Sequence, residues 1–227
     1  MLYIKIITNS IIWLSFLYNK VVETIKYTKK DIDIIKDKLL DGELIAFPTD
    51  TVFGLACVMD IEAIKKVYIA KGRDFNKPLP VMCSGYDMIN KIAIVDEKAK
   101  IIIDKFMPGA LTIVFKKKDE LDPYITQGKP TVGIRVPDDE WIVELIKKIG
   151  KPIMVTSANI SDAGSLLSWE DVYKQMNGKI NGIVCENARG DKSSTIIDVS
   201  DGLRLLREGP IAYDIIEKEI KWNIRFM

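Results

Sequence analysis

The sequence predicts an α/β fold in which helices cover a mixed, twisted sheet. From residue 21 onward, apolar runs of strand length alternate with segments of helical periodicity. Some expected strands follow one another directly, as residues 111–117 and 131–137 do, whereas others are separated by a helix. This combination of β-β succession and βα units is typical of a sheet that contains both parallel and antiparallel pairs.

Strands are expected where apolar runs are bounded by turn residues. The run at residues 152–157 is a clear example, because three consecutive apolar residues lead into Thr156 and Ser157. The expected strands cover residues 21–28, 43–48, 79–83, 111–117, 131–137, 152–157, 182–187, 194–199 and 203–208.

Helix boundaries are marked by capping residues and by glycines. Thr28 and Asp31 form a capping-box signature before the first helix, which ends at Gly42. Asp60 is placed to cap the second helix, and Gly150 ends a later one. Further helical segments begin near residues 84, 96, 138 and 168, and residues 212–220 close the domain.

The composition excludes several classes of protein. The 227 residues suffice for one well-buried domain, and a formal net charge of +1 gives no overall attraction to nucleic acid. The sequence contains no histidine, which excludes Ser-His-Asp catalysis and most zinc-enzyme motifs. Its three cysteines lack CxxC spacing, so we expect a reducing, cytoplasmic environment and no disulfide framework. No GxGxxG follows a strand and no GxxxxGK[ST] occurs, which excludes a dinucleotide fold and a P-loop.

Two segments are expected along the chain. Residues 1–20 form an apolar N-terminal extension of unknown role, and residues 21–220 form a single domain. The extension is interrupted by polar residues and falls short of the about 20 apolar residues that a membrane span needs. It also lacks a small-residue cleavage site, so we expect neither a signal peptide nor a stable membrane association.

Isolated cations lie at the ends of several expected elements. Lys71, Arg73 and Lys77 are close together after the second helix, and such a cluster suits a triphosphate as well as a solvated basic turn. Arg135 lies inside an apolar strand, where a guanidinium needs a partner anion. That anion is either an internal carboxylate or a bound substrate.

Small polar residues follow the strand at residues 152–157. Ser157 and Asn159 come at its end, where α/β sheets present groups to ligands, and the same residue types also cap helices.

Seven motifs then occur in a characteristic order: FPTDTVFGL, AKGRDFNKPLPV, PGALTIVF, TVGIRVP, TSANIS, STIIDV and LREGPI. Together they resemble the YrdC/TsaC family of threonylcarbamoyl-AMP synthases over residues 21–215. The resemblance implies a YrdC-like single domain, related in fold to dihydroxybutanone-phosphate synthase, with a deep electropositive cleft. It also implies that L-threonine, bicarbonate and ATP react to give threonylcarbamoyl-AMP and pyrophosphate, which supplies the t6A modification of tRNA.

The resemblance assigns roles to particular residues by motif position. It implies catalytic roles for Lys71 and Arg73, with Lys71 beside the phosphates of ATP. The implied ATP contacts are Arg73, Lys77, Thr131, Asn159 and Arg207, and the implied threonine contacts are Thr51, Arg135, Ser157 and Ser194. Mg²⁺ is expected as a cofactor without metal ligands from protein side chains. Expected partners are the three substrates, tRNA itself and downstream proteins of the t6A transferase complex.

The sequence departs from the family pattern at several positions. Phe53 replaces a usual tyrosine, and Met82 stands where archaeal relatives often have histidine. Leu167, followed by Ser168, falls where an adenosine-side threonine is expected. The chain ends soon after Arg207, so it resembles the short form of the family, without the second domain of longer relatives.

Two other functions are compatible with the same fold. The principal alternative is a non-catalytic RNA-binding protein or translation factor, and the intact set of Lys71, Arg73, Ser157 and Asn159 favours the enzyme over it. A carbamoyl-adenylate module of the hydrogenase-maturation type is disfavoured, because those chains are much longer and carry zinc-finger-like cysteines.

Overall fold

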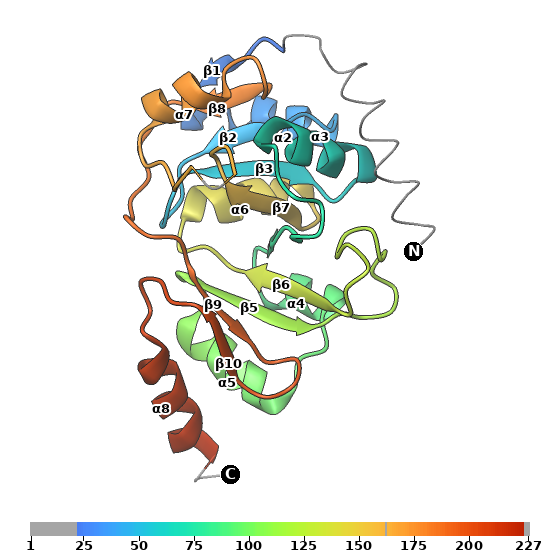
Figure 1. Ribbon diagram of the computed structural model, residues 1–227, viewed down its shortest axis with the longest axis vertical. Helices are drawn as coiled ribbons and strands as arrows, with labels where there is room; N and C mark the ends of the chain where they lie inside the picture. The colour runs from blue at the N-terminus through green and yellow to red at the C-terminus, as the bar shows by residue number, and fades with distance from the viewer. Residues whose placement is uncertain (1–21, 162, 225–227) are drawn as a thin grey trace.

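The computed structural model describes residues 22–161 and 163–224, and these form one continuous sheet with flanking helices (Figure 1). The sheet has ten strands, in the spatial order β1-β8-β2-β3-β7-β4-β6-β5-β9-β10. The strands are β1 (Ile25–Tyr27), β2 (Ile45–Phe47), β3 (Gly54–Val58), β4 (Val81–Met82), β5 (Leu111–Lys116), β6 (Thr131–Arg135), β7 (Ile153–Ser157), β8 (Gly182–Val184), β9 (Thr195–Asp198) and β10 (Arg204–Arg207).

The sheet is mixed, as the sequence predicts. Strand β8 pairs in parallel with both β1 and β2, and the pairs β4–β6 and β5–β9 are also parallel. The remaining pairs, β2–β3, β3–β7, β4–β7, β5–β6 and β9–β10, are antiparallel. The predicted fold class is therefore confirmed.

The helices begin and end close to the predicted boundaries. A 3₁₀ turn (Lys29–Asp31) leads into α2 (Ile32–Leu40), and the carboxylate of Asp31 accepts hydrogen bonds from the backbone N–H and hydroxyl of Thr28. Helix α4 (Tyr86–Ile92) begins one residue later than Ser84 would place it, because Gly85 is its N-cap. The remaining helices are α3 (Ile61–Lys71), α5 (Glu97–Phe106), α6 (Glu140–Ile149), α7 (Trp169–Met176) and α8 (Tyr213–Ile224).

Strand β3 has no counterpart among the strands expected from the sequence. Its five residues, Gly54 to Val58, are all buried, because the strand lies in the middle of the sheet between β2 and β7. A strand buried on both faces shows no alternation of apolar and polar residues, so the period of two that marks half-buried strands is missing.

Helix α3 places the basic segment that follows it. Asp60 caps the helix by accepting hydrogen bonds from the backbone N–H groups of Glu62 and Ala63, at 2.9 and 3.1 Å. The buried face continues to the last residue, Lys71, and Gly72 then reverses the chain with φ of 59°. Such a left-handed C-terminal residue is the usual place for glycine.

A cluster of three aromatic rings connects helix α3 to two loops. The ring of Phe75 lies 4.3 Å from that of Tyr68 and 5.8 Å from that of Tyr124, measured between ring centroids. Phe75 belongs to the loop after α3, and Tyr124 to the loop between β5 and β6. The ring contacts therefore connect both loops to α3.

The N-terminal extension predicted at residues 1–20 lies outside the described residues. Within residues 22–161 and 163–224, no helix is long and apolar enough to cross a membrane.

We expect Asp60→Ala to lower the free energy of unfolding by about 0.5–2 kcal/mol, because the substitution leaves two backbone N–H groups without their acceptor. Urea unfolding followed by circular dichroism measures this change. Asp119→Ala, in an exposed turn, is the matched control and should change stability by less than about 0.5 kcal/mol. An equal effect of the two substitutions would contradict the capping role.

Candidate active site

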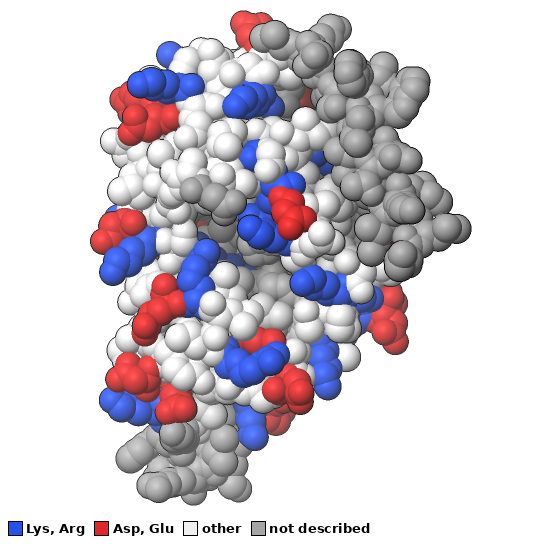
Figure 2. All heavy atoms as spheres, viewed as in Figure 1, with Lys and Arg blue, Asp and Glu red and all other residues white. Residues whose placement is uncertain are grey.

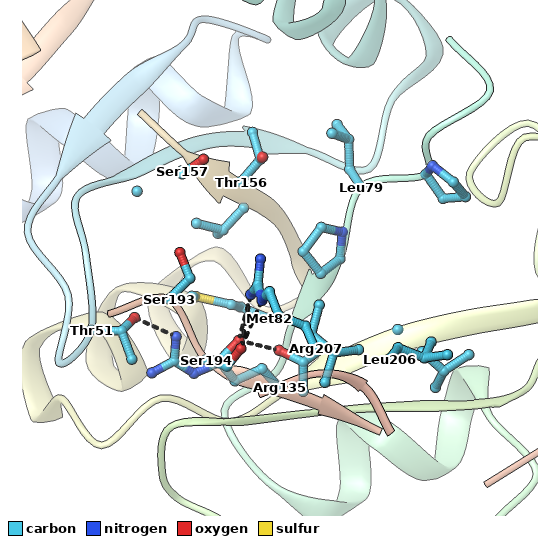
Figure 3. A pocket seen from close by; sticks show the side chains of 18 of the residues that line it. Thr51, Leu79, Met82, Arg135, Thr156, Ser157, Ser193, Ser194, Leu206 and Arg207 are labelled. Carbon is cyan, nitrogen blue, oxygen red and sulfur yellow. Dashed lines mark hydrogen bonds between the residues drawn. The ribbon is translucent and has the colours of Figure 1, made fainter. Parts of the chain in front are cut away.

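A cavity of about 470 Å³ opens between the β3–β7 part of the sheet and the β6–β5–β9 part. This volume is in the range of small-ligand sites. Figure 2 shows Lys and Arg side chains gathered around a hollow near the middle of this face, and Figure 3 shows the residues that line the cavity.

The floor of the cavity is built from alternate residues of neighbouring strands. Thr131, Gly133 and Arg135 of β6 line it, as do Thr112 and Val114 of β5. Because side chains alternate between the two faces of a strand, residues two apart point the same way. The strand register places Val114 opposite Gly133, where the missing side chain keeps the floor open.

Arg135 is a buried guanidinium with three anchors. Its Nη2 donates to Oδ1 of Asp50 at 2.6 Å, its Nη1 donates to the hydroxyl of Thr51 at 2.7 Å, and its Nε donates to the carbonyl of Gly109 at 3.0 Å. The side chains of Arg135 and Asp50 are 6% and 9% exposed. Burial lowers the pKa of Arg135 and the charge of Asp50 opposes this change, so the guanidinium remains protonated.

The hydroxyls beside Arg135 form a chain with a defined direction. Thr51 accepts from Arg135, the hydroxyls of Thr51 and Thr49 lie 2.9 Å apart, and Thr49 donates to the carbonyl of Val52 at 2.7 Å. Because Thr49 donates its single proton to Val52, Thr51 must donate to Thr49. Thr51 is therefore fixed as an acceptor toward Arg135, which strengthens the anchoring of the guanidinium.

The sequence is compatible with two kinds of anionic partner for Arg135, an internal carboxylate and a bound substrate. The structure shows how both can be present. The internal carboxylate is Asp50, yet Arg135 still lines the cavity. A guanidinium has five N–H donors, and three are used by these anchors. One N–H on each terminal nitrogen is left for an anion in the cavity.

Two further arginines are anchored by backbone carbonyls. Arg207 donates from Nε and Nη2 to the carbonyl oxygen of Ser194, at 3.1 and 2.9 Å. Arg73 donates from Nε to the carbonyl of Lys77 at 3.1 Å and from Nη2 to that of Pro78 at 3.2 Å. A carbonyl orients a guanidinium without cancelling its charge, so both arginines keep a full positive charge, and their hydrogen bonds to the described residues do not use Nη1.

The cavity is electropositive. Arg73, Lys129, Arg135 and Arg207 line it, and partial burial together with the charge of Arg135 lowers the pKa of Arg207. Asp198 is the one carboxylate among the described lining residues, and its oxygens accept hydrogen bonds from Ser200 and from Arg204. An unneutralised excess of cations with apolar walls beside it predicts an anionic organic ligand.

The structure brings together most of the predicted site residues and leaves three outside the cavity lining. The residues that line it are Thr51, Arg73, Thr131, Arg135, Ser157, Ser194 and Arg207. The residues that do not are Lys71, Lys77 and Asn159. Lys77 is exposed on the loop after α3, whereas Lys71 and Asn159 are buried.

Lys71 has partners other than a cavity ligand. Its ammonium donates to the carbonyls of Ser157 and Asn159, the latter at 2.6 Å, and lies 3.4 Å from Oδ1 of Asn159. Burial lowers the pKa of Lys71 to about 7, and the nearby charge of Arg73 acts in the same direction.

Several lining residues were not singled out as site residues from the sequence. Lys129 reaches the cavity from the loop before β6, and Thr112 lies on the floor. Thr112 and Ser194 share a hydrogen bond of 2.8 Å between their hydroxyls. The signal for Thr112 is its hydroxyl in an otherwise apolar strand, whereas nothing in the sequence distinguishes Lys129 from the other surface lysines.

The described residues offer no ready site for a metal ion. No group of three or more His, Cys, Asp or Glu side chains suited to a metal occurs among residues 22–161 and 163–224. Asp198, which lines the cavity, and Asp50, the partner of Arg135, already accept hydrogen bonds from arginines. The residues present therefore do not fit a protein-bound Mg²⁺.

Comparison with known proteins places the chain in a family. A family model named for Sua5, YciO and YrdC, and described as "Telomere recombination", matches residues 37–209. The chain belongs to the Sua5/YciO/YrdC family. The resemblance inferred from the seven sequence motifs is thereby confirmed.

Individual members of the Sua5/YciO/YrdC family are similar over most of this chain. The threonylcarbamoyl-AMP synthase of Bacillus subtilis is 39% identical over 187 residues, which cover 80% of this chain and 54% of that protein. A protein named putative threonylcarbamoyl-AMP synthase from Methanocaldococcus jannaschii is 37% identical over 186 residues, covering 81% of this chain and 87% of that protein. The chain thus spans about half the length of the first relative and most of the second.

A solved structure of the Sua5/YciO/YrdC family has the same fold. Sua5 of Pyrococcus abyssi, crystallised in complex with L-threonine, superposes with a TM-score of 0.80 at 33% identity. The match covers 88% of this chain and 61% of that one.

Two of the departures from the family pattern lie at the cavity. Phe53 and Met82 both line it, so the missing tyrosine hydroxyl and the thioether affect its wall directly. Leu167 and Ser168 are not among the lining residues, and Ser168 instead caps α7 by accepting a hydrogen bond from the backbone N–H of Asp171.

Gly190 allows the segment before β9 to cross close to Arg135's anchors. A Cβ atom at this position would lie 2.6 Å from the carbonyl oxygen of Thr51 and 2.7 Å from that of Asp50. We expect Gly190→Ala to destabilise the fold by about 1–3 kcal/mol, because backbone atoms must move to relieve the overlap. Urea unfolding measures the change.

Gly85→Ala is the matched control for this substitution. A Cβ atom there has no neighbour within 4 Å, and its backbone is extended with φ of 162°. If Gly190→Ala were as stable as Gly85→Ala, the close approach to Thr51 would be disproved.

Proposed function

We propose that this protein is an L-threonylcarbamoyladenylate synthase, which makes threonylcarbamoyl-AMP and pyrophosphate from L-threonine, bicarbonate and ATP. The observation that carries the proposal is a cavity lined by three arginines, Arg73, Arg135 and Arg207, each of which has N–H donors that its hydrogen bonds to the described residues do not use. The names of the B. subtilis and M. jannaschii relatives support the same activity.

Arg135 is proposed to bind the carboxylate of threonine. Its remaining N–H donors suit a bidentate carboxylate, and its anchors on Asp50, Thr51 and Gly109 hold the fork in place before the substrate arrives. Ser157, at the end of β7, and Ser194, directly before β9, line the cavity from its two sides with hydroxyls that can orient the substrate. The crystal structure of P. abyssi Sua5 in complex with L-threonine supports an amino-acid site in this fold.

Arg73 and Arg207 are proposed to bind the phosphates of ATP, with Thr131 as a further polar contact. Both arginines are fixed by carbonyls, so little conformational entropy is lost when they meet an anion. Lys77 and Asn159, also predicted as ATP contacts, are not among the residues that line the cavity.

The chemistry needs positioning and charge neutralisation. Bicarbonate gives up hydroxide to form carbon dioxide, and the neutral amine of threonine adds to it and loses a proton to that hydroxide, which gives a carbamate and water. A carbamate oxygen then attacks the α-phosphorus of ATP while pyrophosphate leaves. Cations that face the α-phosphate stabilise the charge that develops on its oxygens. This explains how a chain without histidine can catalyse the reaction. Mg²⁺ would arrive with the phosphates of ATP, because the described residues supply no cluster of ligands for it.

The product is proposed to pass to a tRNA-modifying transferase that forms t6A, in the cytoplasm. The formal net charge of +1 gives no support to tight binding of tRNA by this chain itself. The alternative, a non-catalytic RNA-binding protein, does not account for three arginines that line one cavity together with hydroxyl and apolar side chains.

The decisive experiment is release of pyrophosphate from ATP by the purified protein, with and without L-threonine and bicarbonate. Release that requires both co-substrates, with threonylcarbamoyl-AMP identified by mass spectrometry, would establish the activity. Release independent of threonine, or none from folded protein, would reject it.

We expect Arg135→Lys to raise the KM for threonine by about 10- to 100-fold, because charge-assisted hydrogen bonds of a fork contribute about 1.5–3 kcal/mol. Lysine keeps a cation next to Asp50, whereas alanine would leave this carboxylate unpaired in the interior. The KM for ATP should change by less than about threefold. Equal changes in both KM values would contradict the carboxylate role.

We expect Arg73→Met to show the opposite pattern, with a KM for ATP raised by about tenfold or more and little change for threonine. Steady-state kinetics of pyrophosphate release measures both constants. Lys147→Met, on the exposed face of α6, is the control for loss of one positive charge. An ATP effect of the same size in this control would show that overall charge, and not the site, determines affinity.

A further inference from the structure

Lys71 carries an ionisable ammonium group, yet it is among the most deeply buried large side chains of the protein. It is 1% exposed, and no ion pair with a carboxylate is found for it among the described residues. Lysines are almost never fully buried unless paired, because transfer of an ammonium out of water is strongly unfavourable. A buried ammonium of this kind therefore needs a structural or functional explanation.

The ammonium of Lys71 is fully engaged by one loop. An ammonium has three N–H donors, and its partners here are the carbonyl of Ser157, the carbonyl of Asn159 and, at 3.4 Å, Oδ1 of Asn159. The backbone of Lys71 bonds the same loop, since the N–H of Ser161 donates to its carbonyl at 2.9 Å. Residues 157–161, which we call the β7 loop, are thus tied to the end of α3 from both sides.

The chain reversal at Gly72 separates Lys71 from Arg73. Lys71 ends the buried face of α3 and points into the β7 loop, whereas Arg73 lies beyond the reversal and lines the cavity. Lys71 therefore contacts the β7 loop, whereas Arg73 faces the cavity. The two cations of this short motif are expected to have different roles.

We propose that Lys71 is a positioning residue, which fixes the β7 loop so that Ser157 lies correctly in the cavity wall, and that it does not itself contact the substrates. The proposal rests on the proposed function, because Ser157 is assigned to threonine there. It replaces the expectation that Lys71 lies beside the phosphates, since a phosphate would have to displace carbonyls that already use its donors.

Protonation of Lys71 should affect how firmly the β7 loop is held. The loop presents carbonyls, hydroxyls and one amide to the ammonium, all uncharged, and Arg73 is the charged group that acts on it from the segment after α3. Burial, assisted by Arg73, lowers its pKa to about 7. Above this pH the side chain loses one N–H donor and its charge, so threonine affinity should fall as the pH rises through about 7.

The test compares ligands that differ in phosphate number. Calorimetry measures the affinities of wild type, Lys71→Met and Arg73→Met for L-threonine, AMP and ATP. We expect Lys71→Met to weaken threonine binding about tenfold and to weaken AMP and ATP by equal factors. Arg73→Met should weaken ATP much more than AMP and leave threonine nearly unchanged. If the loss in Lys71→Met grew from AMP to ATP while threonine binding stayed intact, Lys71 would be a phosphate ligand and the proposal would fail.

A second measurement uses the wild-type protein and so does not depend on the folding of a variant. Threonine is a zwitterion from pH 6 to 8.5, so a decrease in its affinity across this range reports on the protein. We expect the decrease in wild type and its absence in Lys71→Met, or in Lys71→Gln if the methionine variant does not fold. A wild-type affinity independent of pH would overturn the proposal. Wild type that binds neither threonine nor ATP would instead reject the proposed function.

Discussion

The buried guanidinium of Arg135 is the group around which the cavity is organised. It lies at the end of β6, and its anchors come from the segment after β2, through Asp50 and Thr51, and from the turn before β5, through Gly109. A charge in this position is stable because a carboxylate, a hydroxyl and a carbonyl replace the water that it has lost. These contacts join the two parts of the sheet that face each other across the cavity.

The cations in the cavity and next to it differ in their hydrogen-bond partners, and these partners indicate different roles. Arg73 and Arg207 are oriented by carbonyls and keep their charge for a ligand, whereas Arg135 shares its charge with Asp50. Lys71 gives all its donors to the β7 loop and acts through that loop. Positive charge alone would not distinguish these residues, so their hydrogen-bond partners are the more informative property.

The sequence by itself determined the fold class, most element boundaries and the family. Local signals are sufficient there: Asp60 caps α3, Gly150 ends α6 with φ of 77°, and the apolar runs mark the strands other than β3. Strand β3 is the exception, since complete burial removes the alternation that sequence analysis detects. The lone arginine in an apolar strand was also sufficient to predict that Arg135 needs an anion.

The tertiary structure decided which predicted residues meet in the cavity. Lys71 and Arg73 are two residues apart and chemically similar, yet the reversal at Gly72 sends one into the β7 loop and the other into the cavity. Likewise, Asp50 and Arg135 are 85 residues apart, and no local pattern links them. Hydrogen bonds between distant segments depend on how the strands are ordered in the sheet, and this order is a property of the packed chain and not of any short stretch of it.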